Sequence, residues 1–597
     1  MHPSNPRFKT ALLLLGLTAI LLCPPGQTQT LADLGQDVRI LKEDLRSLQK
    51  DISDNQKFLL NAGVTANLKD DIRALQTQVA ELQKAMTGAS GAPADTAGIQ
   101  AQIDKLSAEY TALSARLANL STPATAAASA ETTEVKADGT VETAKLEEIF
   151  SSQTSTTLVW VLIAAFLVFF MQAGFALVEC GFSRAKNAAH IMGMNFMDYA
   201  FACLAFWAFG FAIMFGNAGA LSSLGIGDGL LSGSVGFTMG ETTYTFLGTS
   251  GWFLGGDSLY MGGIFTLFIF QMAFAATANT IATGTLAERW KFKAFVMAAI
   301  LVPILIYPVF GHWVWGGGWL AEIGFIDFAG STVVHMAGGV LALVGAKIVG
   351  PRLGKFNPDG SANPIPGHNI PYAVIGTLIL GFGWFGFNCG STVNGNDAQI
   401  GIVAVNTALA SAAGAIAAFY LSQIKFGKPD VSFACNGYLG GLVAITAPCA
   451  FVDAWAAVII GLIGGALVVF SVGFIEDKLR LDDPVGAISV HGVCGAFGGI
   501  AVGLFANGKY GDVSGLFFGN GMQLIIQLIG VLACFLFIGV AGYILFVFID
   551  KTVGNRSSDQ EQAEGLDLSE MGIEAYAPDY GPRPMAEPTR VSLPPRA

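Results

Sequence analysis

Charged side chains are scarce in this chain, and their scarcity decides its class. Asp, Glu, Lys and Arg make up 13% of the 597 residues, whereas ordinary globular chains carry about 25%. Hydrophobic residues make up 53%. Because so few charges cannot cover a water-soluble protein of this length, much of the surface must face lipid. The composition therefore predicts a membrane protein.

Basic clusters and paired cysteines are missing as well. The chain has 32 basic and 44 acidic residues, a formal net charge of -12, and no basic patch able to neutralise a run of phosphates, so no nucleic acid is expected as a partner. Its eight cysteines stand singly, with no C-x-x-C pair, and are interpreted as small apolar residues. No nucleophile and base pair and no metal-ligand set stands out, so we expect no enzyme, no cofactor and no metal.

The first 150 residues predict three segments outside the membrane domain. Residues 1–30 carry Arg7 and Lys9 before an apolar stretch and have the layout of a signal peptide, which we expect to be cleaved. Residues 31–122 show apolar residues at alternating steps of three and four, which predicts external coiled-coil helices. These form either an oligomerisation stalk or a helical hairpin folded on itself. Residues 123–150 are interpreted as a flexible linker.

The region 151–550 contains eleven apolar segments, each long enough to cross a bilayer of roughly 30 Å. They run near 155–180, 192–216, 259–285, 294–312, 329–350, 371–390, 398–422, 433–450, 454–475, 486–506 and 519–549. Residues 551–597 form a tail, in which the stretch 565–576 mixes apolar and acidic residues and is expected to dock on the inner face of the membrane domain.

The positions of Lys and Arg predict the orientation in the membrane. The loops after the first, third, fifth, seventh and ninth segments carry basic residues, whereas the intervening loops hold only Lys509. The basic loops and the C-terminus are therefore expected in the cytoplasm, and the N-terminus outside, in the periplasm. The location implied is the inner, cytoplasmic membrane.

An internal repeat marks a candidate site. Asp327, Gly330, Val334, His335 and Gly339 recur with the same spacing as Asp483, Gly486, Val490, His491 and Gly495. The two copies begin the fifth and tenth segments, which cross in opposite directions, so they predict an inverted-topology repeat whose equivalent residues meet near the midplane. His335 and His491 should therefore meet. Such a pair could join helices by a hydrogen bond, could hold a metal with further ligands, or could line a path for protons or a polar substrate.

Several motifs, in order along the segments, resemble the ammonium transporter and Rhesus protein family, and closely its ammonium transporter branch. The likeness covers about residues 155–580. The motifs are FQMAFA at 270–275, LAERWKF at 286–292, WGGGWL at 315–320, DFAGSTVVH at 327–335, GFNCGS at 386–391, HGVCG at 491–495 and GLDLSEMGIEAY at 565–576. The resemblance implies an all-α, eleven-span polytopic protein of two inverted five-helix halves plus a C-terminal span, preceded here by the external coiled coil. It also implies a homotrimer in which each protomer has its own pore.

The resemblance assigns roles to nine residues. An external ammonium-binding site would use Phe274, Trp315 and Ser391, and Asp327 would stabilise it without necessarily touching the substrate. Phe274 and Phe387 would form a phenyl gate, supported by Phe270 and Gln271. His335 and His491 would line the pore. A cytoplasmic P-II signalling protein is a possible partner at the inner face.

Burial then predicts how ammonium is distinguished from potassium. Aromatic faces attract both cations, but an intact ion is very costly to move into an apolar pore, whereas a neutral amine is not. We expect ammonium to lose a proton near the gate and to pass the histidines as ammonia. The alternative function is an ammonium sensor that signals through its tail or its external stalk.

Overall fold

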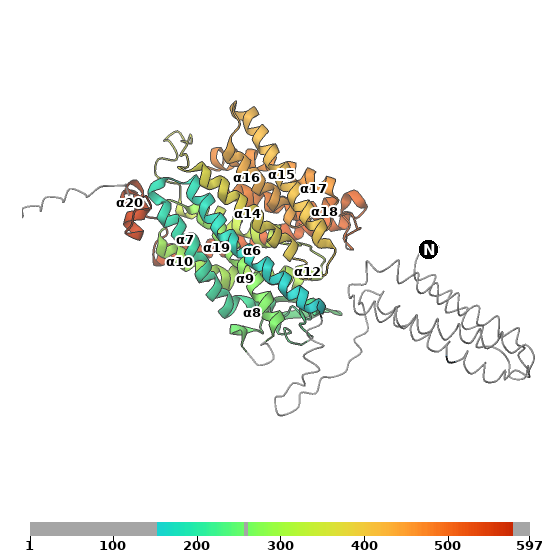
Figure 1. Cartoon of the computed structure of the whole chain (residues 1–597). Helices are drawn as coiled ribbons and strands as arrows, with labels where there is room; N and C mark the ends of the chain where they lie inside the picture. Colours follow the sequence, from blue (N-terminus) through green and yellow to red (C-terminus); the bar gives the residue numbers. More distant parts are fainter. Residues whose placement is uncertain (1–104, 106–151, 228, 256–260, 511, 577–597) are drawn as a thin grey trace, which may run out of the picture. The chain divides into compact units, whose positions relative to one another are not determined.

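The computed structural model describes residues 105, 152–227, 229–255, 261–510 and 512–576. The predicted signal peptide, coiled coil and linker therefore lie outside the described residues, apart from Lys105, and these domain boundaries stay predictions. The chain divides into two compact units, Met1–Gly139 and Thr140–Ala597, and the architecture below is that of the second unit (Figure 1).

Helices account for most of the described chain, and ten of the helical segments are long and apolar enough to cross a membrane. Four of them combine two or more elements end to end. The helices in chain order are α6 (Ser152–Phe182), α7 (Ala188–Ala205) continued by η2 (Phe206–Gly210) and α8 (Phe211–Phe215), α9 (Gly262–Leu286), α10 (Phe292–Leu301) continued by η6 (Val302–Ile306), α11 (Tyr307–Trp315) and α12 (Trp319–Glu322), η7 (Ser331–Met336) continued by α13 (Ala337–Val349), α14 (Ile370–Gly390), α15 (Gln399–Phe426), α16 (Val431–Thr446), α17 (Ala454–Asp477), η8 (Ile488–Val493) continued by α18 (Cys494–Phe505), and α19 (Gly521–Thr552).

The eighth predicted segment is the exception to this length rule. It forms α16, an apolar helix of only 16 residues, which is about 24 Å long at the usual helical rise. Ten spans are therefore supported by length and composition among the described residues. The eleventh remains a prediction that rests on α16.

A two-stranded antiparallel sheet interrupts the helical pattern between α8 and α9. Strands β1 (Ser234–Met239) and β2 (Thr242–Gly248) pair across a turn in which Gly240 has a positive φ of 65°. Glycine adopts this left-handed backbone conformation without the steric cost of a Cβ atom. The sequence predicts an external loop here, because the segment lacks Lys and Arg, and it does not predict the strands.

Close approach between helices depends on glycine. Helix α6 packs along α14, and both lie beside each other in Figure 1. A Cβ added to Gly376 would lie 2.7 Å from the carbonyl oxygen of Gly174, and one added to Gly174 would lie 3.0 Å from the carbonyl of Gly376. The two glycines therefore allow the backbones to touch, as small residues do in membrane helix pairs.

The segment after α19 docks on the helical body, as predicted for residues 565–576. Helix α20 (Asp559–Glu564) and the turn η10 (Asp567–Met571) follow the last long helix. The Asp567 carboxylate accepts a hydrogen bond from the backbone N–H of His190 at 2.8 Å, and the backbone N–H of Leu566 donates to the Asn187 side chain at 2.9 Å. Lys186 donates to the backbone carbonyls of Gln562 and Ala563.

A buried ionic cluster joins three interhelical loops at the same end of the molecule. Arg352, after α13, pairs with Asp482, after α17, at 2.9 Å, and with Glu288, after α9, at 2.9 Å. Arg289 donates to the backbone carbonyl of Asp482 at 2.8 Å. Burial by itself raises the pKa of Asp482, but the guanidinium groups of Arg289 and Arg352 outweigh it and hold the pKa well below its usual value. Asp482 is therefore ionised and paired at neutral pH.

Candidate functional site

The repeated motif forms the same local structure twice. Asp327 accepts hydrogen bonds from the backbone N–H groups of residues 330–333, and Asp483 accepts from Ala487 and Ile488. Each carboxylate thus satisfies free donors at the start of a helix, where a negative charge is also favoured by the helix dipole. A short π-helical turn, η7 or η8, follows in each copy and carries the histidine.

Glycines of the repeat bring the two copies together. Gly330 and Gly486 both have positive φ, 115° and 79°, as the chain turns into each helix. A Cβ on Gly339 would lie 2.2 Å from the backbone nitrogen of Gly492, and one on Gly495 would lie 2.5 Å from the carbonyl of Ser331. Helix α13 therefore packs against η8, and α18 against η7, in a reciprocal arrangement.

The two histidines meet at this crossing. Nδ1 of His491 lies 3.2 Å from Nδ1 of His335, and the rings stack with centroids 5.3 Å apart. Both rings are buried. Because two acceptor nitrogens would repel each other at this distance, one Nδ1 carries a hydrogen and donates it to the other. Nε2 of His335 has no hydrogen-bond partner in the part of the chain that the structure describes. The predicted meeting of the rings is observed, whereas their role in a pore stays a prediction.

A continuous series of rings extends from His335 toward the end of the molecule that contains Trp315. The His335 ring lies 5.3 Å from Phe387, which stacks on Phe274 with centroids 3.9 Å apart and planes inclined by 16°. Phe274 in turn meets Trp315 edge to face at 6.1 Å. Phe274 and Phe387 are fully buried, and their stacked rings lie between Trp315 and His335.

The other two predicted site residues flank Trp315 and Phe387. The Trp315 indole N–H donates to the backbone carbonyl of Asp327 at 2.7 Å, and the hydroxyl of Ser391 donates to the carbonyl of Phe387 at 2.8 Å. Ser391 and Trp315 are partly exposed, whereas Asp327 is buried. Burial raises the pKa of Asp327, and the hydrogen bonds from Thr332, Val333 and Gly330 oppose that rise. Asp327 therefore holds the site's backbone without facing the opening.

Phe270 and Gln271 lie beside the stacked phenyl rings. The Phe270 ring is 4.6 Å from Phe274, and a Cβ on Gly390 would meet Phe270 at 2.9 Å. Gln271 is buried, and its carbonyl oxygen has no hydrogen-bond partner among the described residues. Phe270 thus packs against Phe274, whereas its role in supporting a gate stays a prediction.

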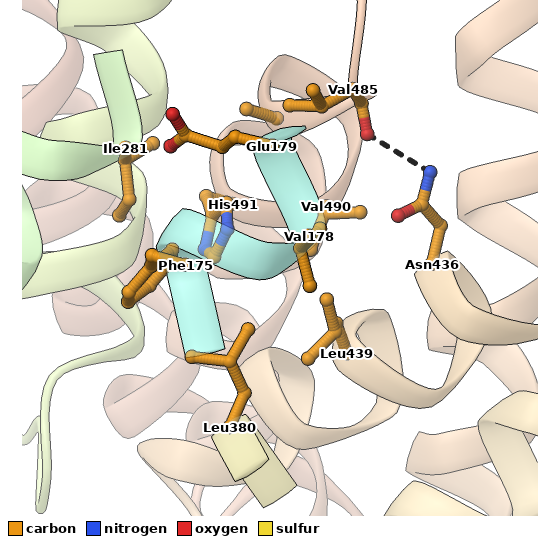
Figure 2. A pocket seen from close by; sticks show the side chains of 11 residues that line it. Phe175, Val178, Glu179, Ile281, Leu380, Asn436, Leu439, Val485, Val490 and His491 are labelled. Carbon is orange, nitrogen blue, oxygen red and sulfur yellow. Dashed lines mark hydrogen bonds between the residues drawn. The ribbon is translucent and has the colours of Figure 1, made fainter. Parts of the chain in front are cut away.

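A cavity lies on the opposite side of the histidine pair. Most of its wall is apolar, and its polar lining comes from His491, Glu179 and Asn436 (Figure 2). Phe175 of α6 also lines it and contacts the His491 ring at 6.0 Å. The ring series therefore continues from Trp315, through Phe274, Phe387 and the histidines, to this cavity.

Two functional positions were missed in the sequence. Trp384 stacks on His335 with ring centroids 4.8 Å apart and donates its indole N–H to Thr446. It stands three residues before Phe387, one helical turn away, which is the spacing that could have indicated it. Glu179 lines the cavity, and the signal for it was an ionisable residue inside a membrane helix.

No group of three or more His, Cys, Asp or Glu side chains able to hold a metal is found within the described part of the chain. Six of the seven cysteines described there are buried, and all seven are unpaired.

Helices long enough to span a bilayer, inverted repeats and a buried ring-lined path define a membrane transport protein. Residues 159–576 match the family model described as Ammonium Transporter Family. The chain belongs to this family.

Named relatives support the same assignment. The ammonium transporter Amt2 of Archaeoglobus fulgidus is 46% identical over 435 residues, which covers 70% of this chain and 87% of that protein. Amt1 of Haloferax mediterranei is 39% identical, covering 70% of this chain and 78% of that protein. Because these relatives are named transporters, the family inference is transport rather than enzymatic catalysis.

Solved structures show the same fold. A protein titled Sensor Amt Protein matches with a TM-score of 0.63 and 39% identity, covering 70% of this chain and 98% of that one. Mep2 of Candida albicans matches with a TM-score of 0.60 and 27% identity, covering 68% of this chain and 87% of that one.

Proposed function

We propose that the chain moves ammonium across the cytoplasmic membrane by binding the cation at an outer aromatic site, deprotonating it near the phenyl gate and passing ammonia along the two histidines. One observation carries this proposal: rings from Trp315 to His491 stand in unbroken contact through buried protein. Such a path has too few polar groups to replace the water around a solvated ion. A small neutral amine needs only the few hydrogen bonds that the histidines can supply.

Recruitment begins at Trp315, Phe274 and Ser391. Partly desolvated aromatic faces attract a monovalent cation by about 1 to 2 kcal/mol. The Ser391 hydroxyl, which already donates to Phe387, keeps lone pairs that accept a hydrogen bond from ammonium. Asp327 contributes a negative charge below this site.

Selection occurs at the gate, because crossing it removes the ion's water. An intact cation in a medium of low dielectric costs several kcal/mol even after relaxation, whereas a hydrogen-bonded neutral amine costs far less. Ammonium escapes the penalty by releasing a proton, and potassium has none to release. Because the two Nδ1 atoms share a single hydrogen, one ring has a bare Nε2 and the other has an Nε2–H. The imidazole pair can therefore offer ammonia one acceptor and one donor.

Transport into proteoliposomes tests the proposal. We expect uptake of labelled methylammonium that excess ammonium suppresses and equal potassium leaves unchanged. Replacing both His335 and His491 with leucine should abolish ammonium-evoked current or remove the discrimination against potassium. Unchanged current and selectivity in the double variant would refute the histidine path.

Orientation and assembly belong to the same proposal. The docked tail, α20 and η10, and the basic loops share one end of the molecule, which we assign to the cytoplasm under the positive-inside rule. We further propose a homotrimer in the lipid bilayer, a P-II protein as a partner at the inner face, and residues 31–122 as external helices released from a signal peptide at 1–30. The mass of the mature chain and its oligomeric mass in detergent test these assignments.

A sensor is the second candidate function, and the observation favouring it is the likeness to the Sensor Amt Protein. A sensor would bind ammonium at the outer site without sustained transport. Saturable ammonium binding in detergent combined with no uptake into liposomes would favour the sensor over the transporter.

A further inference from the structure

Glu179 occupies an unusual position for a carboxylate. It lies in the last turn of α6, inside a membrane-spanning segment, with 2% of its surface exposed. It lines the same cavity as His491 (Figure 2). An ionisable group in this environment is costly to keep, so it indicates a function that requires it.

No ion pair of Glu179 is present among the described residues, and the donors that contact it are neutral. Thr283 of α9 donates to its carboxyl at 2.9 Å, and Asn195 of α7 donates to Oε2 at 2.7 Å. The single hydroxyl hydrogen of Thr283 can go either to this carboxyl or to the backbone carbonyl of Thr280 at 2.5 Å, and the Asn195 side-chain NH2 also donates to the carbonyl of Ile191. These bonds hold the side chain in one place without neutralising it, so it can exist with or without its proton.

The cavity lies on the side of the histidines that we assign to the cytoplasm. Glu179 precedes the basic residues Arg184 and Lys186, Asn436 follows Lys425 and Lys428, and Val485 and Ala487 follow Lys478 and Arg480. The cavity wall is thus built from helix ends that adjoin three basic loops. A substrate that has passed His335 and His491 arrives beside Glu179.

We propose that Glu179 is the acid that returns a proton to the amine at the inner end of the path, an assignment that rests on the proposed transport function. Ammonia leaving His491 accepts the carboxyl proton: the O–H bond of Glu179 breaks, an N–H bond forms, and ammonium enters the cytoplasm. The carboxylate left behind is stabilised by Thr283 and Asn195 and regains a proton from water on the cytoplasmic side. Reprotonation prevents the amine from returning through the apolar path, because the cation cannot re-enter it.

Glu179→Gln is the decisive variant, because the amide fits the same hydrogen bonds. Its carbonyl can accept from Asn195, and its NH2 can donate to Thr283, whose own hydrogen bonds the Thr280 carbonyl. The matched control is Asp477→Asn, the same change at an exposed carboxylate at the end of α17. Each is assayed in full-length protein as initial methylammonium uptake into liposomes and as its ratio in H2O and D2O.

The expected result is a fall in maximal uptake of about tenfold or more in Glu179→Gln, within the usual range for loss of a general acid. The half-saturating concentration should stay within about twofold, because the outer site is intact, and Glu179→Asp should recover part of the rate. The solvent isotope ratio should change in Glu179→Gln and not in Asp477→Asn.

Wild-type uptake and isotope ratio in Glu179→Gln would overturn the assignment. If that variant does not fold, Glu179→Ala assayed with formate inside the liposomes replaces it: restored uptake supports the assignment, and lack of restoration in folded protein refutes it. Absence of uptake by the wild-type protein would instead refute the proposed transport function, so the two failures are distinguishable.

Discussion

At the scale of single residues, the site depends on polar side chains that already form hydrogen bonds within the protein. Both carboxylate oxygens of Asp327 accept hydrogen bonds, from four backbone N–H groups in total. The Trp315 indole N–H donates to the backbone carbonyl of Asp327. The Asp327 side chain therefore fixes the conformation of the backbone that holds the aromatic site. We propose that its contribution to the substrate is a nearby negative charge rather than a contact.

The first prediction concerns that charge. In Asp327→Asn, an NH2 group replaces one acceptor oxygen and faces two backbone donors, which should lower the free energy of unfolding by about 1 to 3 kcal/mol. Loss of the charge should also raise the half-saturating ammonium concentration for uptake by about tenfold, equivalent to about 1.4 kcal/mol. Thermal unfolding in detergent and an uptake titration measure the two effects.

Asp512→Asn is the control, because Asp512 is an exposed carboxylate in a loop assigned to the same outer side. It should change neither quantity. An Asp327→Asn variant with unaltered half-saturation would separate this carboxylate from cation recruitment.

At the scale of elements, the crossing of the two repeats decides where the histidines lie. Helix α13 and turn η8 touch through Gly339 and Gly492, with no room for a single added carbon. Membrane helices gain much of their mutual attraction from such close packing. The contact between His335 and His491 is therefore a consequence of backbone proximity at a glycine.

The second prediction is that Gly339→Ala separates these elements. Its Cβ would lie 2.2 Å from the backbone nitrogen of Gly492, so the helices must move apart. We expect a loss of about 1 to 3 kcal/mol of stability from overpacking, and a fall in methylammonium uptake of about tenfold as the ring contact opens.

The control is Gly401→Ala on α15, where nothing lies within 4 Å of an added Cβ. Alanine there should stabilise the helix by about 0.5 to 1 kcal/mol and leave uptake unchanged. Equal behaviour of the two variants in thermal unfolding would contradict the packing explanation.

At the scale of the whole molecule, a buried ionic cluster ties loops that are distant in sequence. Glu288, Arg352 and Asp482 follow α9, α13 and α17, and the tail joins them where Ser557 bonds the Arg289 carbonyl. Buried charges are tolerated because each is paired, and removal of one partner leaves another uncompensated.

The third prediction uses the depressed pKa of Asp482. Replacement by Asn should cost about 3 to 5 kcal/mol at neutral pH, because Arg352 and Arg289 lose their counter-charge. A depressed pKa stabilises the fold above the unfolded value of about 4, and this stabilisation is lost as the pH falls through the lower folded value. The difference between wild type and Asp482→Asn should therefore shrink below about pH 4.

Thermal unfolding midpoints measured from pH 7 to pH 3 test this dependence. Asp477→Asn, at an exposed carboxylate five positions earlier, should follow the wild-type curve throughout. A constant difference between Asp482→Asn and wild type at every pH would show that the ion pair is not its cause.

Much of the fold was predictable because hydrophobic length and charge placement are properties of the chain itself. Segments predicted at 371–390 and 454–475 became α14 and α17 almost unchanged. The hairpin of β1 and β2 was not foreseen. Strand formation depends strongly on packing against neighbours, which outweighs length and composition in short segments.

The candidate site was likewise predictable only in part. The repeat spacing alone predicted that His335 and His491 meet, since two oppositely directed copies must bring equivalent positions together. Trp384, stacked on His335, and Glu179, beside the cavity, lie outside the repeated motif. Phenylalanine is so abundant in this chain, with 44 residues, that only motif resemblance singled out Phe274 and Phe387.

By itself, the sequence determined that the chain enters a membrane, which segments are apolar enough to cross it and which two halves repeat, because these follow from local composition and spacing. Only the tertiary structure decided which rings touch, which nitrogen of each histidine faces the other and which carboxylate lines the cavity. Those contacts join residues on different helices, and their distances depend on how closely the backbones pack.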